Sequence, residues 1–366
     1  MKKVLIATGI FPPDIGGPAT YGATIKKALE EKGFEVDVAV LSKVGRGLPK
    51  GLRHLIFFFK LLPLARKADL ILALNAVSAG CPALLAAKFF KKKFLVRVVG
   101  DYAWEIASGT GKTNILIDDF QKISKRGLLH KIQTRVCRSA DNVIVPSEYL
   151  KTLVVGWGVA ENKIEIIYNG VDFEPLDISR EEARTKIGTH GNIILSVGRL
   201  VPWKGFKMLI KIMPKLLELN QFFRLVIVGD GPERKKLELM TRNLGLDKKV
   251  YLVGKKSKDN LALYMASADM LVLNSGYEGF SHQILEAMKA GVPVVASAIL
   301  GNREIIRQGE NGFLVKYNDE FNLIEAIKTL HENPELKDEF VAEGKKTVAK
   351  FSVERMIDET IKLISR

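Results

Sequence analysis

The chain has 366 residues, of which 47% are hydrophobic and 27% charged, and its formal net charge is +15. This length suits two domains of ordinary size, and the composition excludes a disordered or fibrous protein. We expect no membrane span, because no apolar run reaches about 18 residues, and the N-terminal run is typical of a first strand rather than a signal peptide. Cys81 and Cys137 lack partners at metal-ligand spacing, which indicates buried thiols in a reducing cytoplasm.

Most of the positive charge lies between Val38 and Arg97, where twelve Lys or Arg accompany a single acid, Asp69, for a net charge of +11. The stretch interleaves charge with bulky apolar residues, as in GLRHLIFFFKLLPLARK and AAKFFKKKF. Such a composition suits an anionic membrane surface or a lipid-linked acceptor, with a cluster such as Lys91, Lys92 and Lys93 as the expected contact with lipid, and it also fits ordinary amphipathic helices with solvated lysines. Nucleic acid is not expected, because no recognisable nucleic-acid motif accompanies the charge.

Strands and helices alternate through the first half of the chain. A helix is predicted over about residues 19–32, and short apolar runs predict strands at residues 2–8, 34–41, 69–75, 93–99 and 141–147. Alternation of this kind is typical of a parallel sheet with helices on both faces.

The pattern pauses after a strand near Ile164 and a turn at Asn169 and Gly170, and it then restarts. Further strands are predicted at residues 192–200, 223–230, 249–254, 268–275 and 292–297. We therefore expect an N-terminal Rossmann-like acceptor-side domain at 1–170, a linker at 171–190, a C-terminal Rossmann-like donor domain at 191–350, and a helix at 351–366 that can cross back to the first domain. Two such parallel sheets would face each other across a cleft and bind the ligand there.

Three constellations carry chemistry. Gly16 and Gly17 stand between the first strand and its helix, where glycine lets a ligand approach the backbone and free N–H groups favour an anion. The loop departs from GxGxxG, so it fits a tight turn as well as a phosphate or acceptor contact. Arg199 and Lys204 follow a strand end in SVGRLVPWKG, where a guanidinium and an ammonium can neutralise a diphosphate.

The third constellation is NSGYEGFSHQILEAMKAGVPVVAS. Glu278 stands in the turn after a strand, Ser281 can cap the next helix, and Glu286 falls within that helix. This placement lets two carboxylates accept hydrogen bonds from one polyol ligand. A surface acid and a helix acid in an ion pair would fit the spacing as well.

The string EGFSHQILEAMKAGVPVVAS resembles the E-x7-E signature of the retaining GT-B glycosyltransferases of glycosyltransferase family 4. The GG loop, PSEYL, IYNGVD, SVGRL with KG, and VGDGPE also match in order. The resemblance covers nearly the whole chain. It implies an α/β GT-B fold and a hexosyltransferase that uses a nucleotide-sugar donor.

The resemblance also assigns roles. Arg199 and Lys204 would hold the donor diphosphate, Glu278 would contact the transferred sugar, and Glu286 would contact the ribose. The remaining donor contacts that it implies come from Gly16, Gly17, Gly229, Gly279, Phe280 and Ser281.

One departure concerns the histidine that many relatives carry after the strand read here as FLVRVVGDYAWE. This chain has Gly100 and Asp101 there. We expect Asp101 to make a polar contact with sugar or acceptor in the histidine's place, or else to cap the following segment.

The resemblance implies front-face chemistry with retained configuration, in which the two cations replace a metal ion and no cofactor is needed. We expect a cytoplasmic enzyme, peripheral on the inner face of the membrane if the basic stretch binds lipid. The rival hypotheses are a GT-B epimerase or phosphorylase, and a non-catalytic binder of sugar nucleotides or nucleic acid.

Overall fold

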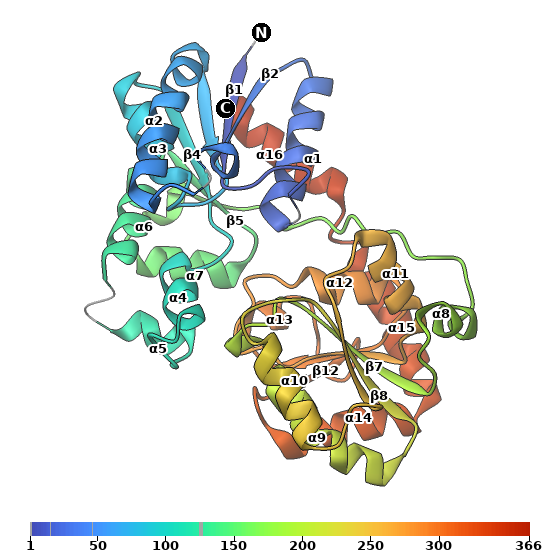
Figure 1. Ribbon diagram of the computed structural model, residues 1–366. Coiled ribbons are helices and arrows are strands. Elements are labelled where there is room, and N and C mark those ends of the chain that lie inside the picture. The colour runs from blue at the N-terminus through green and yellow to red at the C-terminus, as the bar shows by residue number, and fades with distance from the viewer. Residues whose placement is uncertain (1, 15, 46, 124–126) are drawn as a thin grey trace. The chain divides into compact units, whose positions relative to one another are not determined.

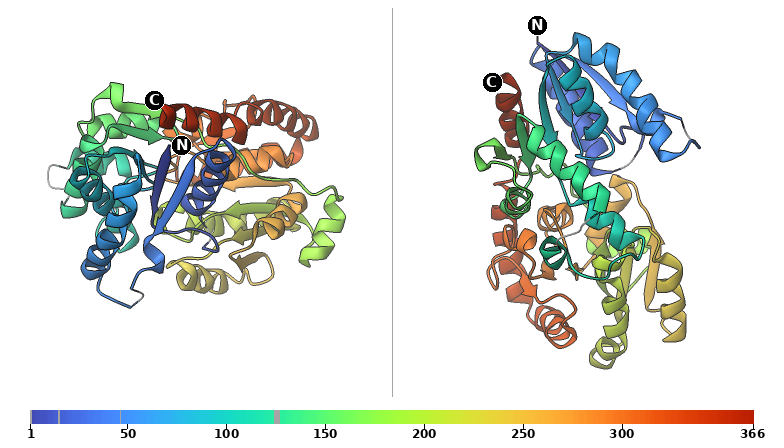
Figure 2. Two further views of the ribbon diagram at one scale, coloured as in Figure 1. Left: turned by 90° about the horizontal axis from the view of Figure 1, so that it is seen from above. Right: turned by 90° about the vertical axis from the view of Figure 1, so that its left-hand side faces the viewer.

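A computed structural model describes residues 2–14, 16–45, 47–123 and 127–366. Within these residues the chain forms two compact units, each built on a six-stranded parallel sheet with helices on both faces (Figures 1 and 2). The first unit comprises Met1–Ala107, Ile117–Tyr168 and Glu354–Arg366, and the second comprises Ser108–Leu116 and Asn169–Val353. The predicted α/β class with two parallel sheets is therefore confirmed.

The sheet of the first unit has the spatial order β2-β1-β3-β4-β5-β6. In that order its strands are Glu35–Val40, Lys3–Thr8, Leu70–Ala73, Lys93–Arg97, Asn142–Val145 and Ile164–Ile166. Its α-helices are α1 (Gly17–Glu31), α2 (Lys50–Lys67), α3 (Gly80–Phe89), α4 (Tyr102–Gly109), α5 (Ile117–Lys122), α6 (Gly127–Ser139), α7 (Glu148–Gly156) and α16 (Val353–Ser365), with 3-10 turns η1 (Leu41–Lys43) and η2 (Glu161–Lys163).

Right-handed crossovers assign these helices to faces of the first sheet. The helices α2 and α3 lie side by side on one face, and α1 and α16 lie on the other (Figure 1). A hydrogen bond between the hydroxyls of Tyr21 on α1 and Thr360 on α16, 3.2 Å long, joins the last helix to this unit. Because helices cover both faces, residues 4–7 of β1 and the whole of β3 are apolar and fully buried.

The sheet of the second unit has the spatial order β12-β11-β10-β7-β8-β9. In that order its strands are Phe313–Val315, Val294–Ser297, Met270–Leu273, Asn192–Val197, Phe223–Val228 and Val250–Gly254. Its helices are α8 (Arg180–Ile187), α9 (Phe206–Leu219), α10 (Arg234–Asn243), α11 (Lys258–Ser267), α12 (His282–Lys289), α13 (Leu300–Arg303), α14 (Glu320–Glu332) and α15 (Pro334–Val348), with the 3-10 turn η3 (Pro202–Lys204).

All strands of the second sheet are parallel, but the side on which the chain adds new strands changes between β7 and β10. From β7 the chain proceeds to β8 and β9 on one side, and later to β11 and β12 beyond β10 on the other. The loops after β7 and β10 therefore diverge at the carboxyl edge of the sheet, where ligands bind in open α/β sheets.

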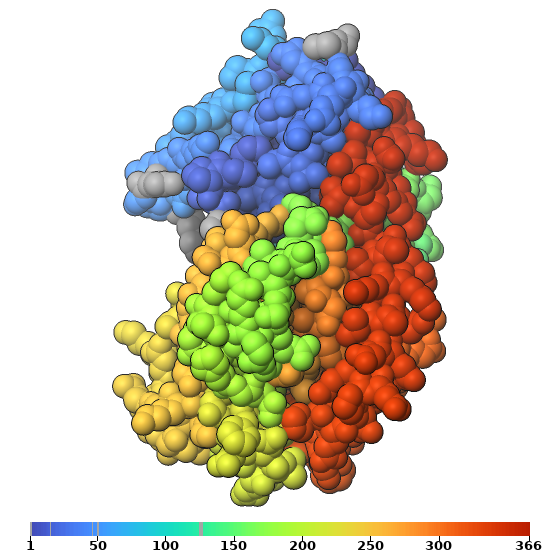
Figure 3. All heavy atoms as spheres, turned by 90° about the vertical axis from the view of Figure 1, so that its right-hand side faces the viewer, coloured from blue at the N-terminus to red at the C-terminus, as the bar shows by residue number. Residues whose placement is uncertain are grey.

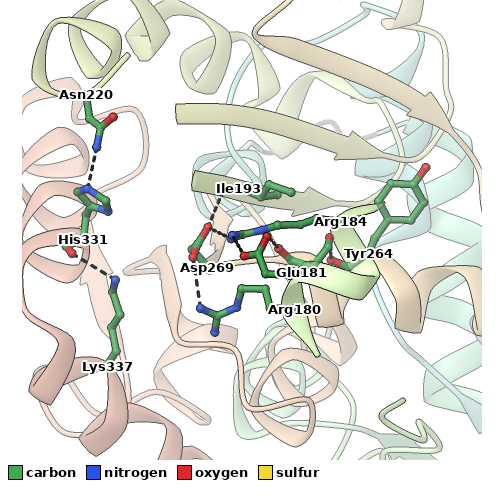
Figure 4. A network of polar contacts seen from close by, with 10 residues as sticks. Arg180, Glu181, Arg184, Ile193, Asn220, Tyr264, Asp269, His331 and Lys337 are labelled. Carbon is green, nitrogen blue, oxygen red and sulfur yellow. Dashed lines mark hydrogen bonds and ion pairs between the residues drawn. The ribbon is translucent and has the colours of Figure 1, made fainter. Parts of the chain in front are cut away.

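At the opposite, amino edge, a buried ion pair fastens α8 to the sheet. The Arg184 guanidinium lies 2.6 Å from a carboxylate oxygen of Asp269, which also accepts a hydrogen bond from the Ile193 backbone N–H (Figure 4). Arg180 adds a longer contact to the same carboxylate. Figure 3 shows α8, in bright green, on the surface beside α11, in gold. The expected linker thus contains a docked helix, which begins after a hydrogen-bonded Ser179 cap and ends at Gly188.

Candidate active site

The loops that follow β7 and β10 carry most of the predicted donor-site residues. Arg199 and Lys204 stand on the first loop, and Glu278, Gly279, Phe280 and Ser281 stand on the second. The second loop is buried throughout from Asn274 to Ser281. A buried loop needs partners for its polar groups, and these partners fix its conformation.

Lys204 and Glu278 form an ion pair across the two loops. The Lys204 Nζ and Glu278 Oε1 atoms are 2.5 Å apart, and the two side chains are 14% and 9% exposed. Ser275 donates a second hydrogen bond of 2.8 Å to the same carboxylate oxygen. The structure therefore brings together Lys204, which is predicted to bind the diphosphate, and Glu278, which is predicted to bind the sugar.

Gly205 allows the two loops to approach. It has φ +65°, and a Cβ at this position would stand 1.8 Å from the backbone oxygen of Asn274. Only glycine fits there, both for its left-handed backbone and for lack of space. The Asn274 side chain and the Gly276 N–H bond the Gly205 and Trp203 carbonyls respectively, and so hold the first loop against the second.

Arg199 is exposed beside these loops, with its guanidinium carbon 5.5 Å from the ring centroid of Trp203. Trp203 is itself buried, so it offers a fixed surface to the guanidinium. An arginine side chain that lies over an indole ring can also contact an anion through its N–H groups. This position suits contact with a bound anion.

Glu286 projects from α12 with a carboxylate that is largely buried. Burial raises the pKa of this group to about 7, with a lowering effect from Lys258 and a raising effect from Asp172. Among the described residues, no hydrogen-bond partner meets Glu286 Oε2 or the buried Ser281 Oγ. Ser281 thus precedes α12 without making the side-chain cap that was expected of it. Unpaired buried oxygens are uncommon in folded proteins and mark a place where a ligand's hydroxyl can donate.

Two residues next to Glu278 were not predicted. Ser275 holds the Glu278 carboxylate, and Gly301 lies so close that a Cβ there would stand 2.2 Å from the Glu278 backbone oxygen. Neither has a sequence signal of its own: Ser275 lies on the same loop as Glu278, and Gly301 lies on α13, beyond the next helix and strand.

Gly229 has a structural explanation that needs no ligand. A Cβ at this position would stand 1.8 Å from the Gly198 backbone oxygen, so glycine lets the loops after β7 and β8 pack together. Phe280 packs its ring against Phe351 at a centroid distance of 5.3 Å, which leaves its backbone, rather than its side chain, for the predicted donor contact.

In the first unit, Gly16 and Gly17 stand at the start of α1. No described atom outside its own neighbourhood lies within 4 Å of where a Cβ on Gly17 would be, whereas one on Gly16 would meet the flexible end of Ile10 at 2.9 Å. The space next to Gly17 is open, as a ligand contact would require. The role of both glycines stays a prediction.

Asp101 is fully buried, and its side chain accepts three hydrogen bonds. Its carboxylate accepts from the Trp104 N–H at 3.0 Å and from the side chains of Gln121 and Gln133 at 2.7 and 3.0 Å. The sequence left two roles open for Asp101, a contact with sugar or acceptor and a cap on the following segment. The hydrogen bond from the Trp104 N–H is that of a cap. A direct sugar contact by Asp101 stays a prediction that this geometry does not support.

The described part of the chain shows neither a metal-binding cluster nor a membrane-spanning helix. It contains no group of three or more His, Cys, Asp or Glu side chains placed to hold a metal ion. None of its helices combines the length and the hydrophobicity that crossing a bilayer requires.

Comparison with known proteins accounts for both halves of the chain. The profile of the family described as Glycosyltransferase Family 4 matches residues 15–175, and that of Glycosyl transferases group 1 matches residues 177–347. The chain belongs to glycosyltransferase family 4, as its ordered motifs suggested.

Two curated relatives illustrate the range of the family. An uncharacterized glycosyltransferase of Methanocaldococcus jannaschii is 35% identical over 242 residues, which are 64% of this chain and 62% of that protein. The N-acetylgalactosamine-N,N'-diacetylbacillosaminyl-diphospho-undecaprenol 4-alpha-N-acetylgalactosaminyltransferase of Campylobacter jejuni is 27% identical over 69% of this chain and 70% of its own length. The chain thus aligns with less than two thirds of the first relative.

Solved structures confirm the GT-B fold. Sucrose-phosphate synthase from Thermosynechococcus elongatus superposes with a TM-score of 0.83 at 22% identity, covering 100% of this chain and 98% of that one. Anabaena HepE in complex with UDP-glucose superposes with a TM-score of 0.79 at 22% identity over the whole of both chains.

Proposed function

We propose that this protein is a retaining glycosyltransferase that moves a sugar from a nucleotide-diphosphate sugar to a lipid-linked, polysaccharide or other acceptor. The observation that carries the proposal is the pairing of Lys204 with Glu278. The two residues lie on the loops after β7 and β10, the neighbouring strands between which the strand order of the second sheet reverses. The family resemblance implies that both residues contact the donor, and in support of this the two stand on loops that hydrogen bonds hold together.

The diphosphate is the natural ligand of the two cations. As the bond from the sugar to the diphosphate breaks, negative charge grows on the leaving oxygen, and nearby fixed cations stabilise that charge. Lys204 would exchange its contact with Glu278 for the phosphate, and Arg199 would add a second positive charge from its place over Trp203. A divalent ion would then be unnecessary.

Release of Lys204 leaves the Glu278 carboxylate to the sugar. Oε1 keeps its hydrogen bond from Ser275, so the group stays in place, and its remaining lone pairs can accept from sugar hydroxyls. Glu286 would accept in the same way from the ribose, which would satisfy the oxygen that lacks a partner. The backbone of Gly279, Phe280 and Ser281 would line the donor between these two carboxylates.

Retention follows if the acceptor attacks the face from which the diphosphate leaves. The bond between the anomeric carbon and the diphosphate oxygen breaks, the acceptor oxygen bonds to the same carbon, and the acceptor's proton passes to the departing phosphate oxygen. No protein nucleophile is required, so the task of the chain is positioning and charge stabilisation.

The relatives suggest which substrates to test first. HepE was solved with UDP-glucose, and the Campylobacter jejuni relative is named for transfer onto a diphospho-undecaprenol acceptor. We therefore favour a UDP-sugar donor and an acceptor carried on a polyprenyl diphosphate, used by an enzyme on the cytoplasmic side of the membrane.

The test is a panel of UDP-, GDP- and ADP-sugars, assayed by thermal shift and by slow donor hydrolysis. One nucleotide class should raise the melting temperature and be hydrolysed. Stabilisation without any turnover, with or without added acceptors, would favour the rival hypothesis of a non-catalytic binder. Conversion of the sugar on an intact nucleotide would favour an epimerase.

A further inference from the structure

The two neighbouring helices α2 and α3 expose large apolar side chains that no described residue of the first unit covers. On α2, Leu52, Leu55 and Phe59 follow one another at helical spacing on the side opposite the buried Phe57 and Leu61. On α3, Leu85 and Phe89 are exposed together, and Phe59 and Phe89 are 59% and 71% exposed. We name the surface formed by these five exposed residues the α2–α3 face.

Both aromatic side chains of the α2–α3 face contact a neighbouring ring. The ring of Phe59 meets that of Phe58 edge to face at a centroid distance of 5.6 Å, and the ring of Phe89 meets that of Phe90 at 4.9 Å. Phe58 and Phe90 are only partly exposed. Each outward ring thus lies beside a second, less exposed ring, and exposed apolar patches mark interaction sites.

The charge that the two helices themselves carry is wholly positive. The two helices contain no Asp or Glu, and the basic side chains of Lys60, Arg66, Lys67 and Lys88 are all exposed. Arg46, which belongs to the same basic stretch, lies outside the described residues. Protein interfaces are typically depleted in lysine, whereas leucine and phenylalanine beside lysine and arginine suit the headgroup region of an anionic bilayer.

We propose that the α2–α3 face docks this protein on an anionic lipid bilayer, with Phe59 and Phe89 entering the headgroup region and the surrounding cations contacting lipid phosphates. This inference goes beyond the proposed function, because it concerns a surface of the first unit and does not depend on which sugar is transferred. The α2–α3 face takes the place of Lys91, Lys92 and Lys93 as the proposed contact with lipid. Lys92 and Lys93 are partly buried, and Lys93 is the first residue of β4.

The experiment is sedimentation with vesicles of phosphatidylglycerol and phosphatidylcholine, compared with phosphatidylcholine alone. The wild type should pellet with the anionic vesicles at low salt and be released at high salt, because screening weakens contacts with lipid charge. Replacing Lys60, Arg66 and Lys67 by Ser should weaken binding by roughly tens- to a hundred-fold, since each charge contributes about a five-fold factor near the surface. The double variant Phe59→Ser, Phe89→Ser should weaken binding at least about ten-fold.

Matched controls come from the other unit. Phe321 is 71% exposed, as Phe89 is, and Phe321→Ser should leave vesicle binding unchanged. The exposed Lys235, Arg242 and Lys248, replaced together by Ser, remove the same charge from a different surface. Donor-induced thermal shift, measured on every variant, reports whether the fold and the donor site survive, so this test is separate from that of the proposed function.

Two outcomes would overturn the proposal. One is a wild type that stays in the supernatant with anionic vesicles at low salt. The other is binding that falls equally in the face variants and in their matched controls, which would indicate nonspecific attraction by net charge. If the aromatic variant fails to fold, the charge variant and its control still decide the question.

Discussion

Lys204 and Glu278, 74 positions apart in sequence, meet in an ion pair of 2.5 Å that joins the loops after β7 and β10. The pair is nearly buried, so both charges lose hydration by water. The attraction between the two charges offsets this loss. In the proposed reaction the same two groups separate, one toward the phosphate and one toward the sugar.

The pair should be measurable as a coupling in stability. Lys204→Ala leaves the Glu278 carboxylate without its cation and should lower the free energy of unfolding by about 2 to 3 kcal/mol. Because Glu278→Gln removes the stranded charge, the double variant should lose less than the sum of the two single losses. Urea denaturation of the four proteins measures this coupling. Strictly additive losses would show that the two side chains do not interact in solution.

Glu286 should make stability depend on pH. Its pKa is about 7 in the folded protein and has an ordinary value of about 4.5 in the unfolded chain. The folded state therefore holds an extra proton between these values, and stability should fall as pH rises through that window. Glu286→Gln should abolish this fall and be more stable than the wild type by up to about 3 kcal/mol near pH 8. Urea titrations from about pH 4.5 to 8 test this; parallel profiles for the two proteins would place the titrating group elsewhere.

The same group should make donor binding depend on pH in the opposite sense. Ribose hydroxyls donate to an ionised carboxylate, so donor affinity should rise as Glu286 loses its proton near neutral pH. Calorimetry with the stabilising nucleotide should show this rise for the wild type and a flat response for Glu286→Gln. A variant with the wild-type pH response would remove Glu286 from the donor site.

Gly301 offers a way to disturb Glu278 without touching it. In Gly301→Ala the new Cβ would meet the Glu278 backbone oxygen at 2.2 Å, so the loop must move. Turnover should fall by roughly ten-fold or more, since a shift of about 1 Å in a positioned group can cost a hundred-fold. Gly156→Ala is the control, because no described atom lies within 4 Å of its Cβ position. Equal turnover in both variants would mean that the Glu278 loop is not catalytically positioned.

Metal removal tests whether the two cations are sufficient. With Arg199 and Lys204 facing the diphosphate, activity should persist in EDTA. We would measure transfer after dialysis against EDTA, then after adding magnesium or manganese. Activity that disappears on dialysis and returns with either ion would refute the assignment of charge neutralisation to these two residues.

Much of the fold could be predicted because its signals are local. Apolar runs such as those of β1 and β7 are continuous, since helices cover both faces of each sheet. The short edge strand β12 (Phe313–Val315) escaped prediction, because three residues carry too little pattern. The helix α8 lies where the sequence predicted only a linker at 171–190, and its docking depends on Asp269, which is distant in sequence.

The candidate site was predictable where residues follow a strand end, as Arg199, Lys204 and Glu278 do. The contacts among them were not, because they arise from long-range packing. Leu116 shows this limit, since its side chain lies 2.7 Å from where a Cβ on Gly276 would stand and so backs the loop that carries Glu278. No local pattern relates these two residues. Asp101 shows the reverse case, because its place after a strand suggested chemistry while its hydrogen bonds are those of a structural cap.

The central claim is that Lys204 stabilises the leaving diphosphate of a sugar-nucleotide donor. Its most direct test is the rate of donor hydrolysis or transfer by Lys204→Ala, compared with Lys211→Ala, which removes an exposed lysine paired with Glu320 on the same unit. We predict a loss of two or more decades for Lys204→Ala, since one charge-stabilising group is typically worth about 3 kcal/mol in the transition state, and no loss for Lys211→Ala. A folded Lys204→Ala protein that turns over the donor at the wild-type rate would contradict the account.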